Sequence, residues 1–137
     1  MRAVLDTCIL KLATLPSKDN AAALVFELAR SGLVEMWASP AILDEYADVL
    51  GDRPDFVAEI VEACQVCHPL MELSVIRHEP DNRFLECALA SGAEYLVTVN
   101  TARGHFDRDH YNEVRVVTPG GFLAITEVRR LLDKLTG

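Results

Sequence analysis

The chain has 137 residues, of which 50% are hydrophobic and 25% are charged. This length fits one globular domain, so residues 1–137 are expected to fold together. With 21 acidic against 13 basic residues, the net charge of −8 argues against a surface that holds nucleic acid through its phosphates alone. A polyanionic substrate would need a local basic rim or metal ions.

The amino-terminal stretch MRAVLDTCIL reaches an Asp at position 6, so it lacks the uninterrupted apolar core of a secretory signal. No apolar run approaches the roughly 20 residues that span a bilayer. The four cysteines lie in a chain without export features, which favours reduced thiols over disulfides. A cytoplasmic protein without membrane contact is expected.

The hydrophobic pattern predicts strands and helices in alternation. In chain order we expect a strand at 2–6, a helix at 20–32, a strand at 34–39, helices at 39–51 and 55–67, a short strand at 73–76, a helix at 81–92, a strand at 93–100, a polar loop at 101–113, a strand at 114–118 and a helix at 120–135. Asn20 and Ser39 are suited to cap the first two helices. This order indicates an α/β fold, a three-layer α/β/α sandwich with a mainly parallel central sheet.

Asp6 immediately follows the first apolar strand. In open parallel sheets, ligands bind beyond the carboxyl ends of the strands, near the point where the strand order reverses. Asp6 is therefore expected at that edge. An aspartate that only ends a strand in a turn is the alternative.

Helix 39–51 carries three acidic residues, and only one of them is turned toward the predicted core. With an advance of roughly 100° per residue, its apolar residues form one stripe. Glu45 lies on the margin of that stripe, whereas Asp44 and Asp48 project from the opposite side. A boundary carboxylate that reaches outward into water is the alternative.

The stretch PDNRFLECALASG has the apolar spacing of a helix, yet its first acid falls inside the apolar sector. Asp81 lies three residues before Phe84 and four before Leu85, whereas Arg83 and Glu86 are expected to face away. Capping is the alternative, because an Asp at a helix start accepts backbone N–H bonds. Capping explains the position of Asp81 better than its inward direction.

These three acids come from distant segments and are expected to converge at the carboxyl edge of the sheet. Buried together without partners they would repel, so protonation, basic partners or a divalent cation must offset the unfavourable energy. Ligation by oxygen alone favours Mg²⁺ or Mn²⁺ over zinc.

At this point the sequence resembles the PIN domain, a family of metal-dependent ribonucleases that includes VapC-like toxins of toxin–antitoxin modules. The resemblance covers nearly the whole chain and rests on four segments: VLDTCIL, SPAILDEYADVL, PDNRFLECALASGAEYLVTVN and VRVVTPGGFL. The third of these segments is the most specific.

The resemblance implies a metal site at Asp6, Glu45 and Asp81. Asn100 stands where many members have an Asp, and it is taken as a fourth catalytic residue. Cys8 replaces the more usual Asn.

In the same way, Thr7, Thr98 and Arg103 would position substrate, and Asp107 or Asp109 would supply charge that Asn100 lacks. Arg103, His105, Arg108 and His110 form the best local basic rim, with a solvated loop as the alternative.

The implied activity is endonucleolytic hydrolysis of RNA with Mg²⁺ or Mn²⁺, leaving a 5′-phosphate and a 3′-hydroxyl. The implied partners are an antitoxin protein and a second copy of the chain in a homodimer. A catalytically degenerate PIN-like domain that binds proteins is the alternative, favoured by Asn100 and by the net charge.

Two other enzyme or cofactor classes are less well matched. The segment CQVCH, from Cys64 through Cys67 to His68, fits a haem-attachment pattern, but no second C-x-x-C follows it. An Asp at the end of the first strand would also suit a phosphotransfer nucleophile. A haloacid-dehalogenase-like start would need a second Asp at position 8, which is Cys.

Overall fold

The computed structural model describes residues 1–17 and 19–137. The strands are β1 (Arg2–Leu5), β2 (Glu35–Ala38), β3 (Cys64–Val66), β4 (Tyr95–Val97), β5 (His110–Tyr111) and β6 (Val114–Val117). The helices are α1 (Thr7–Ala13), α2 (Ala21–Arg30), α3 (Pro40–Val49), α4 (Pro54–Ala63), α5 (Asp81–Ser91), α6 (Pro119–Leu123) and α7 (Thr126–Thr136).

The strands form one sheet in the order β3-β2-β1-β4-β6-β5. All neighbouring strands are parallel except β5, which runs antiparallel to β6. The chain first builds outward from β1 through β2 to β3, and then crosses back to place β4 on the other side of β1. The strand order therefore reverses between β1 and β4, where α/β folds commonly bind ligands.

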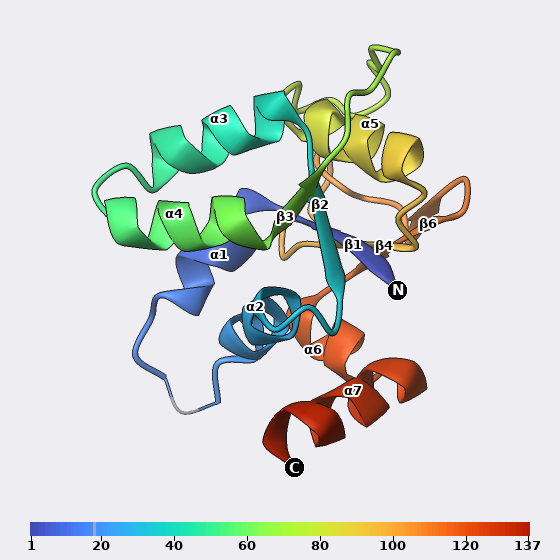
Figure 1. Ribbon diagram of the computed structural model, residues 1–137. Coiled ribbons are helices and arrows are strands. Elements are labelled where there is room, and N and C mark those ends of the chain that lie inside the picture. Colours follow the sequence, from blue (N-terminus) through green and yellow to red (C-terminus); the bar gives the residue numbers. More distant parts are fainter. Residues whose placement is uncertain (18) are drawn as a thin grey trace.

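Helices cover both faces of the sheet, as Figure 1 shows with α3 and α5 above it and α2, α6 and α7 below it. Helix α5 packs on β1, β2 and β4, while α2 packs on α1 and α6. Ala3, Val4 and Leu5 of β1 are all buried, as expected for a strand covered on both faces. The predicted three-layer α/β/α sandwich with a mainly parallel sheet is confirmed.

Local capping signals are confirmed at two helix starts. The Asn20 side chain accepts a hydrogen bond from the Ala23 N–H at 3.0 Å, and Ser39 accepts one from the Ile42 N–H at 3.3 Å. Gly92 follows α5 in the left-handed region, with φ of 70°, where a residue without a Cβ is favoured.

The predicted helix at 55–67 is wrong at its end. Helix α4 stops at Ala63, and residues 64–66 instead form β3, which pairs in parallel with β2 at the sheet edge. The helical apolar spacing continues through Cys64, but strand pairing satisfies this backbone better once β2 lies alongside it.

The predicted strand at 73–76 is also wrong. The Leu73 N–H donates to the Glu86 carboxylate at 2.8 Å, and the Ile76 N–H donates to the Asn82 amide oxygen at 3.0 Å. Side chains of α5 therefore replace the strand partner that this segment would need.

Three further differences concern segment boundaries. Residues 7–13 form α1, for which no element was predicted, and the predicted helix at 120–135 is divided into α6 and α7. The predicted loop at 101–113 contains the short strand β5, which turns into β6 through Asn112 with φ of 53°. Among the described residues, no helix is both long enough and apolar enough to cross a membrane.

Candidate metal site at the carboxyl edge of the sheet

The candidate site lies where the strand order reverses. Asp6 directly follows β1, and its N–H donates to the Val97 carbonyl of β4 at 3.0 Å. Thr98 and Asn100 follow β4 at the same edge. The backbone pairing of two central strands therefore fixes these side chains next to one another.

The Asp6 carboxylate is buried in a set of hydrogen-bond donors. Its Oδ2 accepts from the Thr98 hydroxyl at 2.7 Å, the Asn100 amide at 3.2 Å and the Cys8 thiol at 3.4 Å. The Thr98 hydroxyl oxygen in turn accepts from the Asn100 N–H at 2.9 Å. The turn after β4 thus serves to hold Asp6 in place.

Glu45 reaches the site from α3. The Thr7 hydroxyl, at the start of α1, donates to its carboxylate, so α1 and α3 meet here. Glu45 is half-buried, whereas Asp44 and Asp48 of the same helix are exposed.

Asp81 is the first residue of α5, and only 6% of its side chain is exposed. It is not the cap of the helix, because Pro80 occupies the N-cap position. Its Oδ2 instead pairs with His105 Nδ1 at 2.9 Å. Asp81 therefore points inward and contacts His105, in the segment after β4.

The three carboxylates influence one another electrostatically. Burial raises the pKa of Glu45 above its ordinary value, and the negative charges of Asp6 and Asp81 raise it further, against the hydrogen bond from Thr7. Burial also raises the pKa of Asp81, with Asp6 adding to the effect and His105 opposing it. The Cys8 thiol is likewise affected, because burial and then Asp6 raise its pKa to about 11.

This environment fits a divalent cation held by oxygen atoms. Among the described residues, no Lys or Arg lies within 4.0 Å of the carboxylates of Asp6, Glu45 or Asp81. The carboxylate oxygens of these three described residues do not all lie within 4.8 Å of one another. Mg²⁺ tolerates such spacing, because it commonly keeps several waters and binds one or two carboxylates directly.

A tighter group of potential ligands lies beside Asp81. Ligand atoms of His78, Asp81 and His105 lie within 4.8 Å of one another, and the two imidazole centroids are 4.6 Å apart. The sequence pattern predicts no role for His78, and it predicts His105 only as part of a basic rim. The position of His78 three residues before Asp81 was the one available signal.

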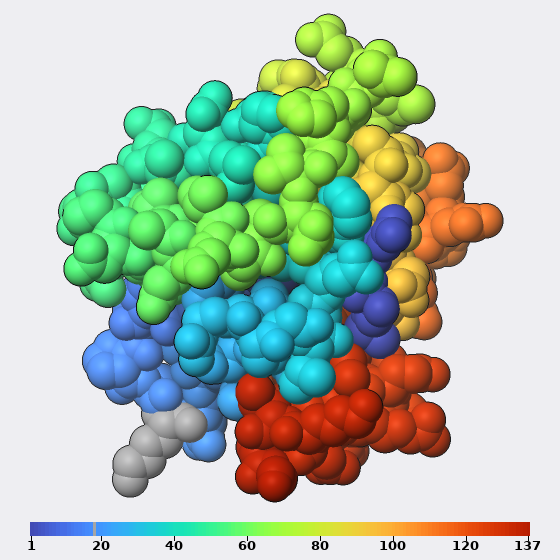
Figure 2. Space-filling view, viewed as in Figure 1, coloured from blue at the N-terminus to red at the C-terminus, as the bar shows by residue number. Residues whose placement is uncertain are grey.

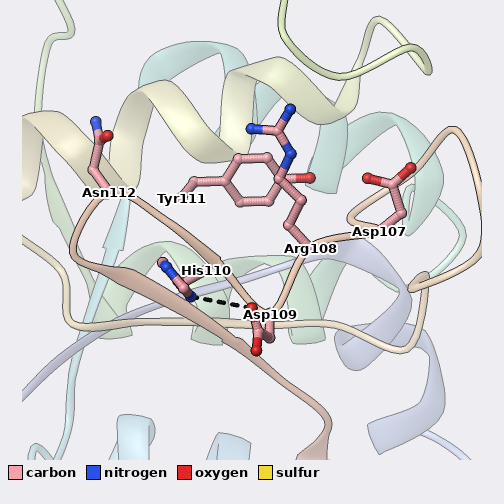
Figure 3. A pocket seen from close by; sticks show the side chains of 6 residues that line it. All are labelled: Asp107, Arg108, Asp109, His110, Tyr111 and Asn112. Atoms are coloured by element: carbon pink, nitrogen blue, oxygen red, sulfur yellow. Dashed lines mark hydrogen bonds and ion pairs between the residues drawn. The ribbon is translucent and has the colours of Figure 1, made fainter.

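The other proposed contact residues are divided between two places. Arg103 is exposed, and Asp107 accepts a hydrogen bond from the Gly104 N–H at 3.3 Å. Figure 3 shows a surface hollow that Asp107 and Asp109 both line, and in it Asp109 pairs with His110 at 3.1 Å.

Arg108, in the same hollow, lies over the Tyr111 ring at 5.5 Å. Of the four members of the expected basic rim, Arg108 and His110 therefore line this hollow, whereas His105 contacts Asp81.

The CQVCH segment begins with β3, an edge strand that lies next to β2 in the sheet. Cys64 and Cys67 pack against the hydrophobic core, and the Cys67 sulfur is 3.2 Å from that of Cys87. His68 is exposed. The two cysteines thus have a packing role in this fold.

Comparison with known proteins identifies the family. No curated protein and no solved structure gives a significant match. A family model described as PIN domain matches residues 2–102, which include Asp6, Glu45 and Asp81. Because that match spans well over half of the 137 residues, the chain belongs to the PIN domain family, whose members are generally nucleases that act on RNA and bind divalent metal ions.

Proposed function

We propose that this chain is a divalent-metal-dependent endoribonuclease that hydrolyses RNA phosphodiesters. One observation carries the proposal. Asp6, Glu45 and Asp81 meet where the strand order of a PIN domain sheet reverses, close enough for Asp6 to raise the pKa values of the other two. Among the described residues, no Lys or Arg forms an ion pair with them. Residues 103–137 are proposed to complete the same domain, because β6 extends the sheet beside β4.

Asp6, Glu45 and Asp81 are the proposed metal ligands, and Asn100 is the proposed fourth catalytic residue. A bound Mg²⁺ or Mn²⁺ would activate water and stabilise negative charge on the phosphate. The chain supplies the positioning. Thr98 and Asn100 orient Asp6 through their hydrogen bonds to it.

Two further residues complete the proposed machinery. Thr7 orients Glu45 through its hydroxyl. The exposed Arg103 follows the same turn as Asn100 and is the proposed contact for RNA phosphate.

The direct test is cleavage of RNA by the purified protein in the presence of Mn²⁺. Wild type should cleave, EDTA should stop cleavage, and Asp81→Asn should reduce the rate by about 100-fold or more, as for loss of a charged group that positions the reaction. Asp48→Asn is the matched control, because it removes an exposed acid from α3. Equal cleavage by wild type and Asp81→Asn would assign the activity to another site or to a contaminant.

We further propose that the protein is the toxin of a toxin–antitoxin pair, acting in the cytoplasm as a homodimer. The support is the resemblance to VapC-like toxins, together with apolar side chains suited to a protein partner. Leu70, Met71 and Val75 are 101%, 56% and 56% exposed. They lie in a segment that projects at the upper right of Figure 2.

Expression in cells tests the toxin role. Wild type should arrest growth, and Asp6→Asn should not, while both accumulate to the same level. Coexpression of the product of an adjacent gene should relieve the arrest and copurify with the protein. Growth arrest by both forms would contradict the toxin role, and sedimentation of the purified chain as a monomer would contradict the homodimer.

A degenerate protein-binding domain is the second candidate, and one observation favours it. Each carboxylate of the site already accepts a hydrogen bond from a protein group: Asp6 from Thr98 and Asn100, Glu45 from Thr7, and Asp81 from His105. A site of this kind can persist without metal. Absence of any thermal stabilisation by Mn²⁺, with unchanged or higher stability in Asp6→Asn, would favour this candidate over the nuclease.

A further inference from the structure

Two imidazoles and one carboxylate form a compact set of donors next to the proposed nuclease site. Asp81 Oδ2 lies 2.9 Å from His105 Nδ1, and the ligand atoms of His78, Asp81 and His105 fall within 4.8 Å of one another. His78 is exposed and 34% of the His105 side chain is exposed, so an ion from solvent can reach both rings. The set therefore combines proximity with access.

The backbone holds the two histidine segments together. The His78 N–H donates to the Gly104 carbonyl at 2.7 Å, and the His78 carbonyl accepts from the Asp81 N–H at 3.0 Å. Gly104 has φ of 92°, a left-handed conformation that side chains rarely adopt. Little chain reorganisation is needed to bring all three donors onto one ion.

The second histidine segment is also anchored in the core. Phe106, directly after His105, is 1% exposed, and its N–H donates to the Asn100 carbonyl at 3.1 Å. The position of His105 therefore follows from β4, and that of Asp81 from α5. Anchoring in the core on one side and α5 on the other therefore constrain the spacing of His105 and Asp81.

The donor types differ from those of the carboxylate site. Imidazole nitrogen suits Zn²⁺, Co²⁺ and Ni²⁺, whereas Mg²⁺ prefers oxygen ligands. Three protein ligands also leave coordination positions open for water or substrate oxygen, as in catalytic rather than structural zinc sites. The residues around Asp81 therefore offer two chemically different sets of donors, one with imidazoles and one with carboxylates only.

We propose that His78, Asp81 and His105 form a transition-metal site, distinct from the carboxylate site and joined to it by the shared Asp81. The site would take a Zn²⁺- or Co²⁺-class ion, with His78, Asp81 and His105 as its protein ligands. Its existence does not depend on the proposed ribonuclease activity, because it is defined by metal binding alone.

Direct titration of the purified chain with Co²⁺ and Zn²⁺ tests this site, using visible absorption for Co²⁺ and calorimetry for Zn²⁺. His78→Ala and His105→Gln should each weaken Co²⁺ binding by about 10-fold or more, because loss of even an outer-shell partner of a metal typically costs about that much. Both variants should leave Mg²⁺ binding within about twofold of wild type, because oxygen ligands hold that ion. His105→Gln keeps an amide that can donate to Asp81, so it should fold as wild type does.

His110→Ala and His68→Ala are matched controls, because both histidines are exposed and lie outside the group. They should bind Co²⁺ as wild type does. Wild-type Co²⁺ affinity in both His78→Ala and His105→Gln, or an equal loss in His110→Ala, would overturn the proposal.

The outcome is separable from that of the nuclease proposal. Histidine-dependent Co²⁺ binding without RNA cleavage would leave this site standing and remove the nuclease. RNA cleavage with Mg²⁺, together with Co²⁺ affinity that is unchanged in both histidine variants, would support the nuclease and remove the transition-metal site.

Discussion

Replacing Glu45 by Gln should make the metal-free chain more stable while removing its stabilisation by cations. Partial burial and the charges of Asp6 and Asp81 raise the pKa of Glu45, so the folded state holds this proton more tightly than the unfolded state does. Stability of wild type therefore falls as pH rises from the ordinary value of 4.5 through the raised folded value. Gln is neutral, and it can still accept the hydrogen bond from Thr7.

The expected magnitude is modest, because Glu45 is only half-buried and solvent screens its charge. We expect Glu45→Gln to gain about 1 kcal/mol at pH 7 without metal, or ~3–5 °C in Tm for a chain of this size. Mn²⁺ at about 100 times its Kd should stabilise wild type by about 2.7 kcal/mol, or ~10 °C. Most of that second shift should be absent in the variant.

Thermal melts followed by circular dichroism, with EDTA and with Mn²⁺, measure both effects. The same melts at pH 4 and pH 7 test the sign, since the advantage of Glu45→Gln should vanish below the ordinary pKa of 4.5. Asp48→Asn makes the same charge change on an exposed face of α3 and should leave the Mn²⁺ shift intact. A full Mn²⁺ shift in Glu45→Gln, or an equal loss in Asp48→Asn, would refute the reasoning.

Three other substitutions separate metal binding from folding. Asn100→Asp should raise Mn²⁺ affinity by about tenfold and lower metal-free stability by about 1 kcal/mol, because a fourth carboxylate then faces Asp6; unchanged affinity by calorimetry would contradict this. Asn82→Ala should lose about 2–4 kcal/mol in urea unfolding, because its buried amide hydrogen-bonds both the N–H and the carbonyl of Ile76. Tyr46→Phe should lose about 1 kcal/mol in the same assay, through its hydrogen bond to the Leu5 carbonyl, and should keep the Mn²⁺ shift.

The parts of the fold that the sequence predicted well depend on local rules. A buried parallel strand needs a continuous apolar run, and residues 3–5 of β1 form one. Caps need a side chain that reaches its own helix, as Asn20 and Ser39 do. Asp6 could be placed at the carboxyl edge of the sheet because its position relative to β1 is a matter of chain order alone.

The parts predicted wrongly depend on contacts between distant segments. Residues 64–66 have helical spacing, but they pair with β2 because the sheet has an open edge there. Arg83 and Glu86 were expected to face solvent, yet Glu86 is 5% exposed because the segment before α5 folds over it and Leu73 donates to its carboxylate. No local pattern contains that information.

The histidine group shows the same limit at the site itself. His78 and His105 are brought together by a backbone hydrogen bond between His78 and Gly104, which joins two loops of irregular conformation. Periodicity describes regular elements, so it gives no register for such loops. The acidic residues could be placed from the sequence because they lie on helices or directly after a strand, where periodicity and chain order define their direction.

The hydrogen-bond donors around the carboxylates explain how one arrangement can be stable without metal and still attract it. Thr7, Thr98 and Asn100 satisfy carboxylate oxygens as neutral donors, so they orient each group without cancelling its charge. A Lys in any of these places would form an ion pair and remove the attraction for a cation. Burial first, and then the charges of neighbouring carboxylates, raise the pKa values of Glu45 and Asp81, so their negative charges are unfavourable here. A bound cation would relieve that unfavourable energy, and this is a source of metal affinity.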